Sequence, residues 1–371
     1  MSTWWYHGIR AIFVPAILAA AVAVLASPSH AQIVIEDVAG RTVEMAAPAR
    51  RIILEGPAYY TGLALISDQA AELIVGVGGT AHRGFFEAER DLAGKPHVGT
   101  IANHTFSIEK ALSLQPDLLI AALSAPGQQS AVENAFANAG IPVLYVDFLL
   151  DPADNTLRSM DILGRAIGES DKAAAFAQFY AARRDQVMDR LADRQPPFPR
   201  LYMAGLTQDA TCCWSFGNGF MTPFFAPLRI ADIASGQIAG LSGQLSLEYV
   251  IAQNPDLIIA SDRSYGPEAM FGRGETAADS KAILQAFAQT PGLMEVQAAR
   301  DVRVHGIDLT LMRTPLNILA IELFAKWSHP ELFSDLDPQS TLDTINERFL
   351  AKPLKGPFWV SLGARPEGID P

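Results

Sequence analysis

The sequence contains only two cysteines, and they are neighbours at Cys212 and Cys213. With two cysteines and seven histidines, the chain has too few ligands for a cysteine-rich zinc module. Adjacent cysteines also lack the backbone separation of an ordinary disulfide. The sequence therefore favours two buried thiols at a strand end. A vicinal disulfide and the ligation of a soft metal are the alternatives.

Charged residues are scarce, and positive charge is in the minority. Charged residues form 18% of the chain, and the formal net charge is −12. This balance argues against nucleic acid as a partner, because its phosphates would be repelled. The apolar content of 49% and the length of 371 residues are those of a globular protein with room for two α/β domains.

A single long apolar run, over residues 11–26, lies close to the N-terminus. It follows Arg10 and precedes small residues up to Ala31, which is the pattern of a secretory signal peptide. We predict a signal peptide over residues 1–31 that is cleaved after Ala31, and a mature chain in the periplasm. A retained membrane anchor is the alternative, although the run is short and contains Pro15. No later run is long enough to cross a bilayer, so no membrane insertion is expected after cleavage.

Motifs of common catalytic centres are also missing. The sequence has no G-x-S-x-G, no H-E-x-x-H and no C-x-x-C. The glycine-rich run at residues 76–79 lacks the acidic strand end about 20 residues later that a dinucleotide-binding loop requires. These absences count against an enzyme and give no reason to expect a cofactor.

What the sequence does contain is one segment twice. Residues 107–121 read SIEKALSLQPDLLIA, and residues 246–260 read SLEYVIAQNPDLIIA. In each, the Ser predicts a capped helix start, the Pro ends the helix, and the apolar run that follows predicts a buried parallel strand. Two such units predict two similar α/β lobes, with Glu109 and Glu248 at equivalent positions.

The order of predicted elements divides the rest of the chain. Residues 32–150 predict a hairpin and then a βαβ series, which indicates an N-terminal lobe with a mostly parallel sheet. Residues 151–195 carry no strand signal, and their helical spacing predicts a connecting helix about 30 Å long. Residues 196–371 predict a C-terminal lobe whose tail packs back on it. Within the first lobe, residues 55–60 are expected to form a loop before a helix.

Two α/β lobes, a rigid connecting helix and a signal peptide resemble the class III periplasmic binding proteins for iron–siderophore complexes, haem and vitamin B12. The opening residues IVIEDVAGRTVEMAAPARRIILEG and the later segments GIPVLYVD and NPDLIIA are similar to family segments. The resemblance covers nearly the whole mature chain. It implies the substrate-binding component of an ABC importer, which delivers a metal chelate to a permease dimer and its ATPase.

The resemblance also implies a role for the two matched acids. In that family the Glu of each Ser-x-Glu helix start docks on arginines of the permease, which corresponds to Glu109 and Glu248 here. A helix dipole favours such a carboxylate near a helix N-terminus, and the alternative is that both acids only cap their helices. The chain departs from the family pattern at Thr61, where many members have an acid, and at Thr100, where haem binders often have Tyr.

Ligand-binding residues are expected beyond the carboxyl ends of the strands, where open α/β sheets bind ligands. Aromatic rings there would contact a flat chelate, and guanidinium groups would match carboxylate or catecholate oxygens. We therefore predict an anionic ferric siderophore-type chelate as the ligand, although these arginines could instead pair with surface acids. The predicted ligand-binding residues are Tyr59, Tyr60, Arg83, His104, Trp214, Arg263, Tyr265 and Arg313.

Other functions stay open on the same fold. The ligand could be cobalamin, haem or another metal chelate, and His82 and His104 could ligate nickel because imidazole suits that metal. A chelate-modifying enzyme and a ligand sensor are the remaining classes, since a fold does not decide function.

Overall fold

The computed structural model describes residues 1–3, 32–79, 91–101, 104–122, 130–206, 212–217, 222–262, 271 and 276–363. Met1–Ala31 and Gln32–Pro371 are separate compact units. The predicted signal peptide lies almost wholly outside the described residues. Among the residues described, no helix has both the length and the apolar content that spanning a membrane requires. The fold below is that of Gln32–Pro371.

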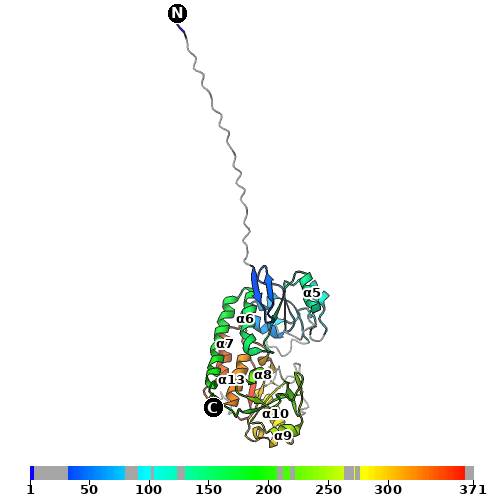
Figure 1. The fold of residues 1–371 in the computed structure, drawn as a ribbon, viewed down its shortest axis with the longest axis vertical. Coiled ribbons are helices and arrows are strands. Elements are labelled where there is room, and N and C mark those ends of the chain that lie inside the picture. The colour runs from blue at the N-terminus through cyan, green and yellow to red at the C-terminus, as the bar shows by residue number, and fades with distance from the viewer. Residues whose placement is uncertain are drawn as a thin grey trace. The chain divides into compact units, whose positions relative to one another are not determined.

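The first lobe opens with an antiparallel hairpin and continues as a parallel sheet (Figure 1). The sheet order is β4-β3-β5-β6, and all its pairings are parallel, as expected from the βαβ pattern. Nearly every residue of its strands is buried, which is typical of a sheet covered on both faces. The strands are β1 (Ile33–Glu36), β2 (Thr42–Met45), β3 (Ile52–Leu54), β4 (Ile74–Val77), β5 (Leu118–Ala122) and β6 (Val143–Val146). The helices are α1 (Ala58–Ala64), α2 (Ala70–Leu73), α4 (Ile108–Ser113) and α5 (Ser130–Asn138).

Two helices connect the lobes, α6 (Pro152–Ile167) and α7 (Ser170–Leu191). Asp151 caps α6, and Gly168 ends it in the left-handed conformation that glycine adopts without strain. The 22 residues of α7 span about 33 Å, close to the length expected. On α7, Tyr180 donates to Asn317 and Arg183 donates to Glu322, so the helix is bonded to the second lobe.

The second lobe is built on a larger mixed sheet of order β10-β8-β7-β11-β12-β13, with β9 also paired to β7. Its centre, β7-β11-β12, is parallel, while β8, β10 and β13 run antiparallel to their neighbours. The strands are β7 (Arg200–Leu206), β8 (Trp214–Phe216), β9 (Ala231–Asp232), β10 (Ser242–Gln244), β11 (Leu257–Asp262), β12 (Val304–Ile307) and β13 (Trp359–Ser361). The helices are α8 (Thr222–Phe225), α9 (Leu247–Gln253), α10 (Ala277–Ala288), the 3-10 helix η1 (Leu293–Glu295), α11 (Gln297–Arg300), α12 (Leu309–Met312), α13 (Asn317–Ser328) and α14 (Pro338–Arg348).

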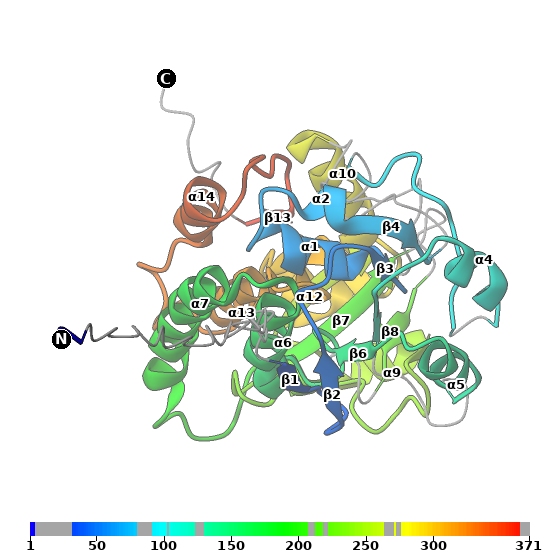
Figure 2. The same cartoon turned by 90° about the horizontal axis from the view of Figure 1, so that it is seen from above.

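The two faces of this sheet pack against different layers, because side chains alternate along each strand. On β7, Leu201 and Met203 belong to the core cluster that includes α13, whereas Tyr202 and Ala204 belong to the cluster that includes α10. Figure 2 shows α6, α7 and α13 side by side, with the β1–β2 hairpin against α6.

The duplicated segment folds in the same way in both lobes. Ser107 and Ser246 cap α4 and α9 by accepting a backbone N–H three residues on, at 3.3 and 3.1 Å. The Asp of each Pro-Asp pair then accepts backbone N–H groups at the start of the neighbouring strand. Asp117 accepts from Arg51 at 2.9 Å, and Asp256 accepts from Arg200 at 2.8 Å. The sequence repeat is therefore a structural repeat.

Candidate functional site

Acidic residues mark the carboxyl ends of parallel strands in both lobes. Glu55 follows β3 and Asp147 follows β6 in the first sheet, while Asp262 ends β11 and Asp308 follows β12 in the second. All four are buried, with exposed fractions between 4% and 8%. Parallel α/β sheets bind ligands at this edge, so these residues frame the candidate site.

Glu55 ties together the loops that leave this edge in the first lobe. Its Oε1 accepts the backbone N–H of Ile101 at 3.1 Å, and its Oε2 accepts that of Ala122 at 3.4 Å. The backbone of Gly78 comes so near that a Cβ there would lie 2.1 Å from the Glu55 carbonyl oxygen. Only glycine fits at this position, which explains part of the glycine-rich run.

Asp147 organises the turn from β6 into α6. Its Oδ1 accepts the N–H groups of Leu149 and Leu150, both at 2.8 Å. Its Oδ2 accepts the N–H of Asp151 and the side-chain amide of Asn155, both at 2.9 Å. Four donors thus compensate a buried carboxylate, and the charge is held fixed at the edge of the site.

Tyr59 and Arg313 interact electrostatically although they come from different lobes. Tyr59 lies half-buried on α1, with its ring centroid 6.5 Å from that of Phe148. Burial, and then the charge of Glu55, raise the pKa of Tyr59 above its ordinary value, and Arg313 opposes this. Arg313 ends α12, and burial lowers its pKa to about 10, with Tyr59 acting in the opposite direction.

These pKa shifts indicate the protonation states of Tyr59 and Arg313 at neutral pH. Arg313 stays a cation, because even a pKa of about 10 lies well above 7. Tyr59 stays a phenol, because burial, and then the charge of Glu55, raise its pKa above the ordinary value. One lobe therefore contributes a neutral O–H and the other a guanidinium, and both groups can donate to the same oxygen-rich ligand.

Tyr60, the neighbour of Tyr59, has a different environment. It is 2% exposed, and its hydroxyl donates to Asp91 at 2.9 Å. Lys352, from the C-terminal segment, donates to the same carboxylate at 2.7 Å.

The prediction of a loop over residues 55–60 is wrong in its second half, because α1 already begins at Ala58. Adjacent helical residues point about 100° apart, so the helix turns one tyrosine to the core and leaves the other at the edge.

Trp214 begins β8 and lies half-buried at the carboxyl end of β7. Ser215 pairs with Ala204 of β7, so Trp214 stands level with the last residues of that strand. Its carbonyl accepts a hydrogen bond from the Tyr202 hydroxyl at 3.1 Å. In the sheet, Trp214 is paired with Gln244 of β10. The β8–β10 ribbon was not predicted, because strands this short and rich in Ser and Gly carry little pattern.

The other predicted ligand residues lie elsewhere or outside the description. His104 is exposed, in a turn where its N–H donates to the Ile101 carbonyl at 3.0 Å. Arg83, Arg263, Tyr265 and also His82 lie outside the described residues. Within the ranges that the structure describes, no group of three or more His, Cys, Asp or Glu side chains is arranged to hold a metal ion.

Sequence reasoning passed over Glu55 and Asp147, although a signal was present. Each acid directly follows a fully buried apolar strand, Ile52–Leu54 or Val143–Val146. An acid that ends a buried parallel strand is a candidate for the ligand edge.

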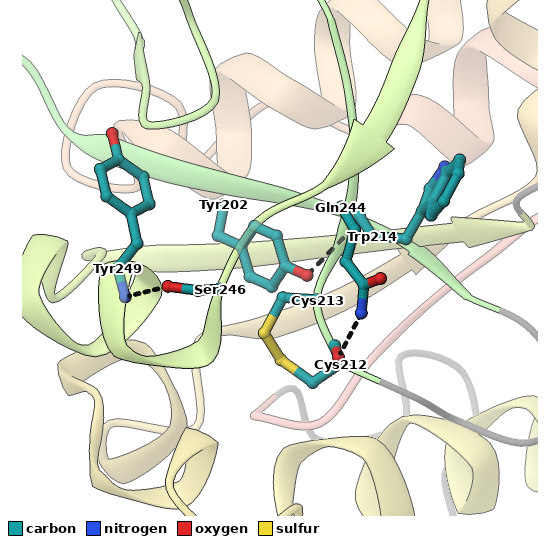
Figure 3. The surroundings of a disulfide bond; sticks show 7 residues. All are labelled: Tyr202, Cys212, Cys213, Trp214, Gln244, Ser246 and Tyr249. Atoms are coloured by element: carbon teal, nitrogen blue, oxygen red, sulfur yellow. Dashed lines mark hydrogen bonds between the residues drawn. A yellow bond between two sulfur atoms is a disulfide. The ribbon is translucent and has the colours of Figure 1, made fainter. Parts of the chain in front are cut away.

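Cys212 and Cys213 form a disulfide, which corrects the expectation of two thiols (Figure 3). Cys213 is fully buried and Cys212 is half-buried. The Cys213 carbonyl accepts the N–H of Leu245 at 2.9 Å, and the Cys212 carbonyl accepts the side-chain amide of Gln244 at 3.4 Å. Composition alone does not reveal whether adjacent sulfurs meet, since the local backbone decides it.

Glu109 and Glu248 are both exposed in the first turns of α4 and α9. Each of these helices leads into a parallel strand, so its first turn lies toward the carboxyl edge of its own sheet. The two acids are thus matched surface positions on the same side of the fold as the candidate site.

Comparison with known proteins places this geometry in context. A family model described as periplasmic binding protein matches residues 70–309. The chain is 21% identical over 240 residues to the uncharacterized ABC transporter substrate-binding lipoprotein YvrC of Bacillus subtilis, covering 64% of this chain and 70% of the relative.

Solved structures share the fold. The TroA-like periplasmic binding protein FepB from Veillonella parvula matches with a TM-score of 0.80 and 26% identity, over 89% of this chain and all of that one. The molybdate periplasmic binding protein MolA of Haemophilus influenzae, bound to molybdate, matches with a TM-score of 0.67 and 19% identity, over 87% of this chain and 99% of that one. The expected two-lobed α/β fold is confirmed by these likenesses.

Proposed function

The chain belongs to the periplasmic binding protein family, and from this premise we propose that it captures an anionic metal chelate between its lobes for an ABC importer. Its general role is that of a substrate-binding component that works outside the cytoplasm and hands a small ligand to a permease. We place its lobes at residues 32–150 and 196–371, joined by the segment 151–195. Cleavage of a signal peptide after Ala31 belongs to the same proposal.

The observation that carries the ligand class is the Tyr59–Arg313 pair. A guanidinium presents five N–H donors in a plane that matches carboxylate and catecholate oxygens, and the phenol adds an O–H from the opposite lobe. The Glu55 and Asp147 carboxylates at the same edge already accept backbone N–H groups, so they do not require hydrogen-bond donors from the ligand. A ligand that presents oxygen anions to Arg313 is favoured over a neutral hydroxamate or cobalamin.

The same pair supports a ligand whose metal is already chelated. Direct ligation of a ferric ion by Tyr59 would bring a second positive charge close to the Arg313 guanidinium, and like charges repel. Together with the absence of a metal-binding cluster among the residues described, this favours recognition through the chelator's oxygens. A small oxyanion is the second candidate, because the similar MolA structure is bound to molybdate and an oxyanion would use the same donors.

We further propose that Glu109 and Glu248 dock the protein on the permease. Their support is the structural repeat, which presents one exposed acid per lobe on the side of the ligand edge. Paired charges at two separate points give orientation as well as attraction.

Calorimetric titration of the purified chain tests the ligand class. The probes are ferric citrate, a ferric tris-catecholate, a neutral ferric trihydroxamate, cyanocobalamin and molybdate. We expect the anionic probes to bind more tightly, and Arg313→Ala to weaken them by about 1.5–3 kcal/mol, as for a charge-assisted hydrogen bond. Arg190→Ala is the matched control, because Arg190 lies near the end of α7 and pairs there with Asp335. Equal affinity for cobalamin, or an Arg313→Ala variant that binds like the parent, would refute the proposal.

A further inference from the structure

The Cys212–Cys213 disulfide lies where the second lobe meets the candidate site. It directly precedes β8, whose antiparallel pairing puts Cys213 level with the end of β7. That end belongs to the carboxyl edge of the parallel strands, where the buried Asp262 also lies. The only two cysteines of the chain therefore stand at the ligand edge.

General stabilisation of the fold does not account for a bond at this place. A disulfide stabilises chiefly by closing a loop in the unfolded chain, and the gain grows with loop length. Between neighbouring residues the loop is as short as it can be, so no separate elements are cross-linked. What the bond restricts is the local backbone, and that backbone leads straight into Trp214.

The contacts around the bond show what is being positioned. Cys213 faces the buried side of the sheet with Tyr202, and Trp214, the next residue, points to the other side (Figure 3). Phe216, on the same side as Trp214, belongs to the main core cluster, which also contains Leu201 and Met203 of the neighbouring strand β7. The Tyr202 hydroxyl donates to the Trp214 carbonyl, and the Leu245 backbone N–H donates to the Cys213 carbonyl, so both residues of this corner are held.

We propose that the Cys212–Cys213 disulfide is a redox-sensitive positioning element of the ligand site. In the oxidised state it holds the corner before β8, so Trp214 is fixed at the carboxyl end of β7, on the ligand edge. In the reduced state the corner gains conformational freedom. Ligand affinity then falls, because the corner and Trp214 must be ordered again on binding. The effect on affinity depends on the function proposed above, whereas the effect on the corner itself does not.

The redox step needs a dithiol reductant. The S–S bond between Cys212 and Cys213 breaks, and the two sulfurs take up two electrons and two protons as they become thiols. The dithiol supplies both and closes its own disulfide, through a mixed-disulfide intermediate. In an oxidising compartment outside the cytoplasm the bond is expected to be formed.

The test compares the full chain before and after reduction with dithiothreitol, which is removed under anaerobic conditions before measurement. Alkylation and mass measurement of the unreduced protein should find no free thiol. Amide hydrogen exchange without ligand should become about tenfold faster in β8 and β10 after reduction and stay unchanged in the β1–β2 hairpin. Titration with ferric tris-catecholate should show about tenfold weaker binding by the reduced protein. The double variant Cys212→Ser, Cys213→Ser should behave as the reduced form and ignore dithiothreitol.

The outcomes separate the two proposals. Two free thiols in the unreduced protein, or equal exchange in β8 before and after reduction, would overturn the inference. Equal affinity of both redox forms for a probe that does bind would overturn it as well. Faster exchange in β8 with no binding of any probe supports the positioning of Trp214 and refutes the proposed ligand class. Reduction of the natural chain decides the matter even where the double variant does not fold.

Discussion

His305 couples the stability of the second lobe to pH. It lies on β12 and is 9% exposed, with its ring stacked on Trp327 at a centroid distance of 4.5 Å. Its Nδ1 lies 2.8 Å from the hydroxyl of Ser361 on β13. Burial, and then the charge of Arg303, lower the pKa of His305 from 6.5 to about 3. The folded protein therefore holds a neutral imidazole throughout the mildly acidic range.

The sign and size of the effect follow from proton linkage. Below pH 6.5 the unfolded chain binds a proton at His305 that the folded chain does not, so the free energy of unfolding falls as the pH falls. Between the two pKa values the slope is about 1.36 kcal/mol per pH unit, which gives a loss of about 2 kcal/mol at pH 5 and about 4 kcal/mol at pH 3. His329 acts in the same direction, because it is fully buried and burial lowers its pKa too.

Urea unfolding at several pH values between 7 and 5 measures this slope. Below pH 6.5 the free energy of unfolding should fall more steeply with falling pH in the natural chain than in His305→Gln. The difference in slope should approach about 1.36 kcal/mol per pH unit, which corresponds to one proton. The glutamine amide can still bond Ser361 but does not titrate. His104→Asn, at an exposed position, is the control for the loss of a histidine. A His305→Gln variant with the slope of the natural chain would show that the imidazole is not held neutral.

Two further predictions concern docking and the N-terminal hairpin. Glu109→Ala and Glu248→Ala should each impair uptake at limiting ligand while calorimetric affinity stays unchanged, and normal uptake by the double variant would exclude docking by these acids. Asp37→Ala should cost about 3–5 kcal/mol in urea unfolding, because its fully buried side chain pairs with Arg41 at 2.6 Å and also accepts backbone N–H groups. The neighbouring Glu36→Ala removes an exposed pair and should cost less than about 1 kcal/mol; equal losses would contradict this account.

The fold class was predictable because the patterns that encode it are local. Alternation gave the hairpin, helical spacing gave α7, and the Ser-x-Glu and Pro-Asp signals gave the repeated helix–strand unit. The same signals failed at α1, where Gly-Pro was interpreted as a loop. Proline is tolerated at the start of a helix, where its missing N–H has no intrahelical partner to lose, and Pro57 is the N-cap of α1.

The site was less predictable because it depends on tertiary contacts between segments that are far apart in the sequence. Tyr59 and Arg313 were both named from the sequence, but as separate loop residues in a larger set. Their electrostatic pairing arises only when α1 of one lobe and α12 of the other come together. The order of strands in each sheet, which sets how far apart Glu55 and Asp147 lie along their common edge, also has no local signature.

The repeat explains why the two lobes are alike in their helix–strand units, whereas the loops beyond their strands differ. The aspartates of the repeat, Asp117 and Asp256, hold the start of the neighbouring strand in the same way, so both lobes place their first helical turn alike. That shared framework presents Glu109 and Glu248 symmetrically, as a two-point contact with a partner requires. The loops beyond the strands are not constrained by the repeat, and there the lobes diverge, with a phenol on one side and a guanidinium on the other. Similar frameworks and different loops are consistent with the two roles proposed above, docking on a permease and recognition of an asymmetric ligand.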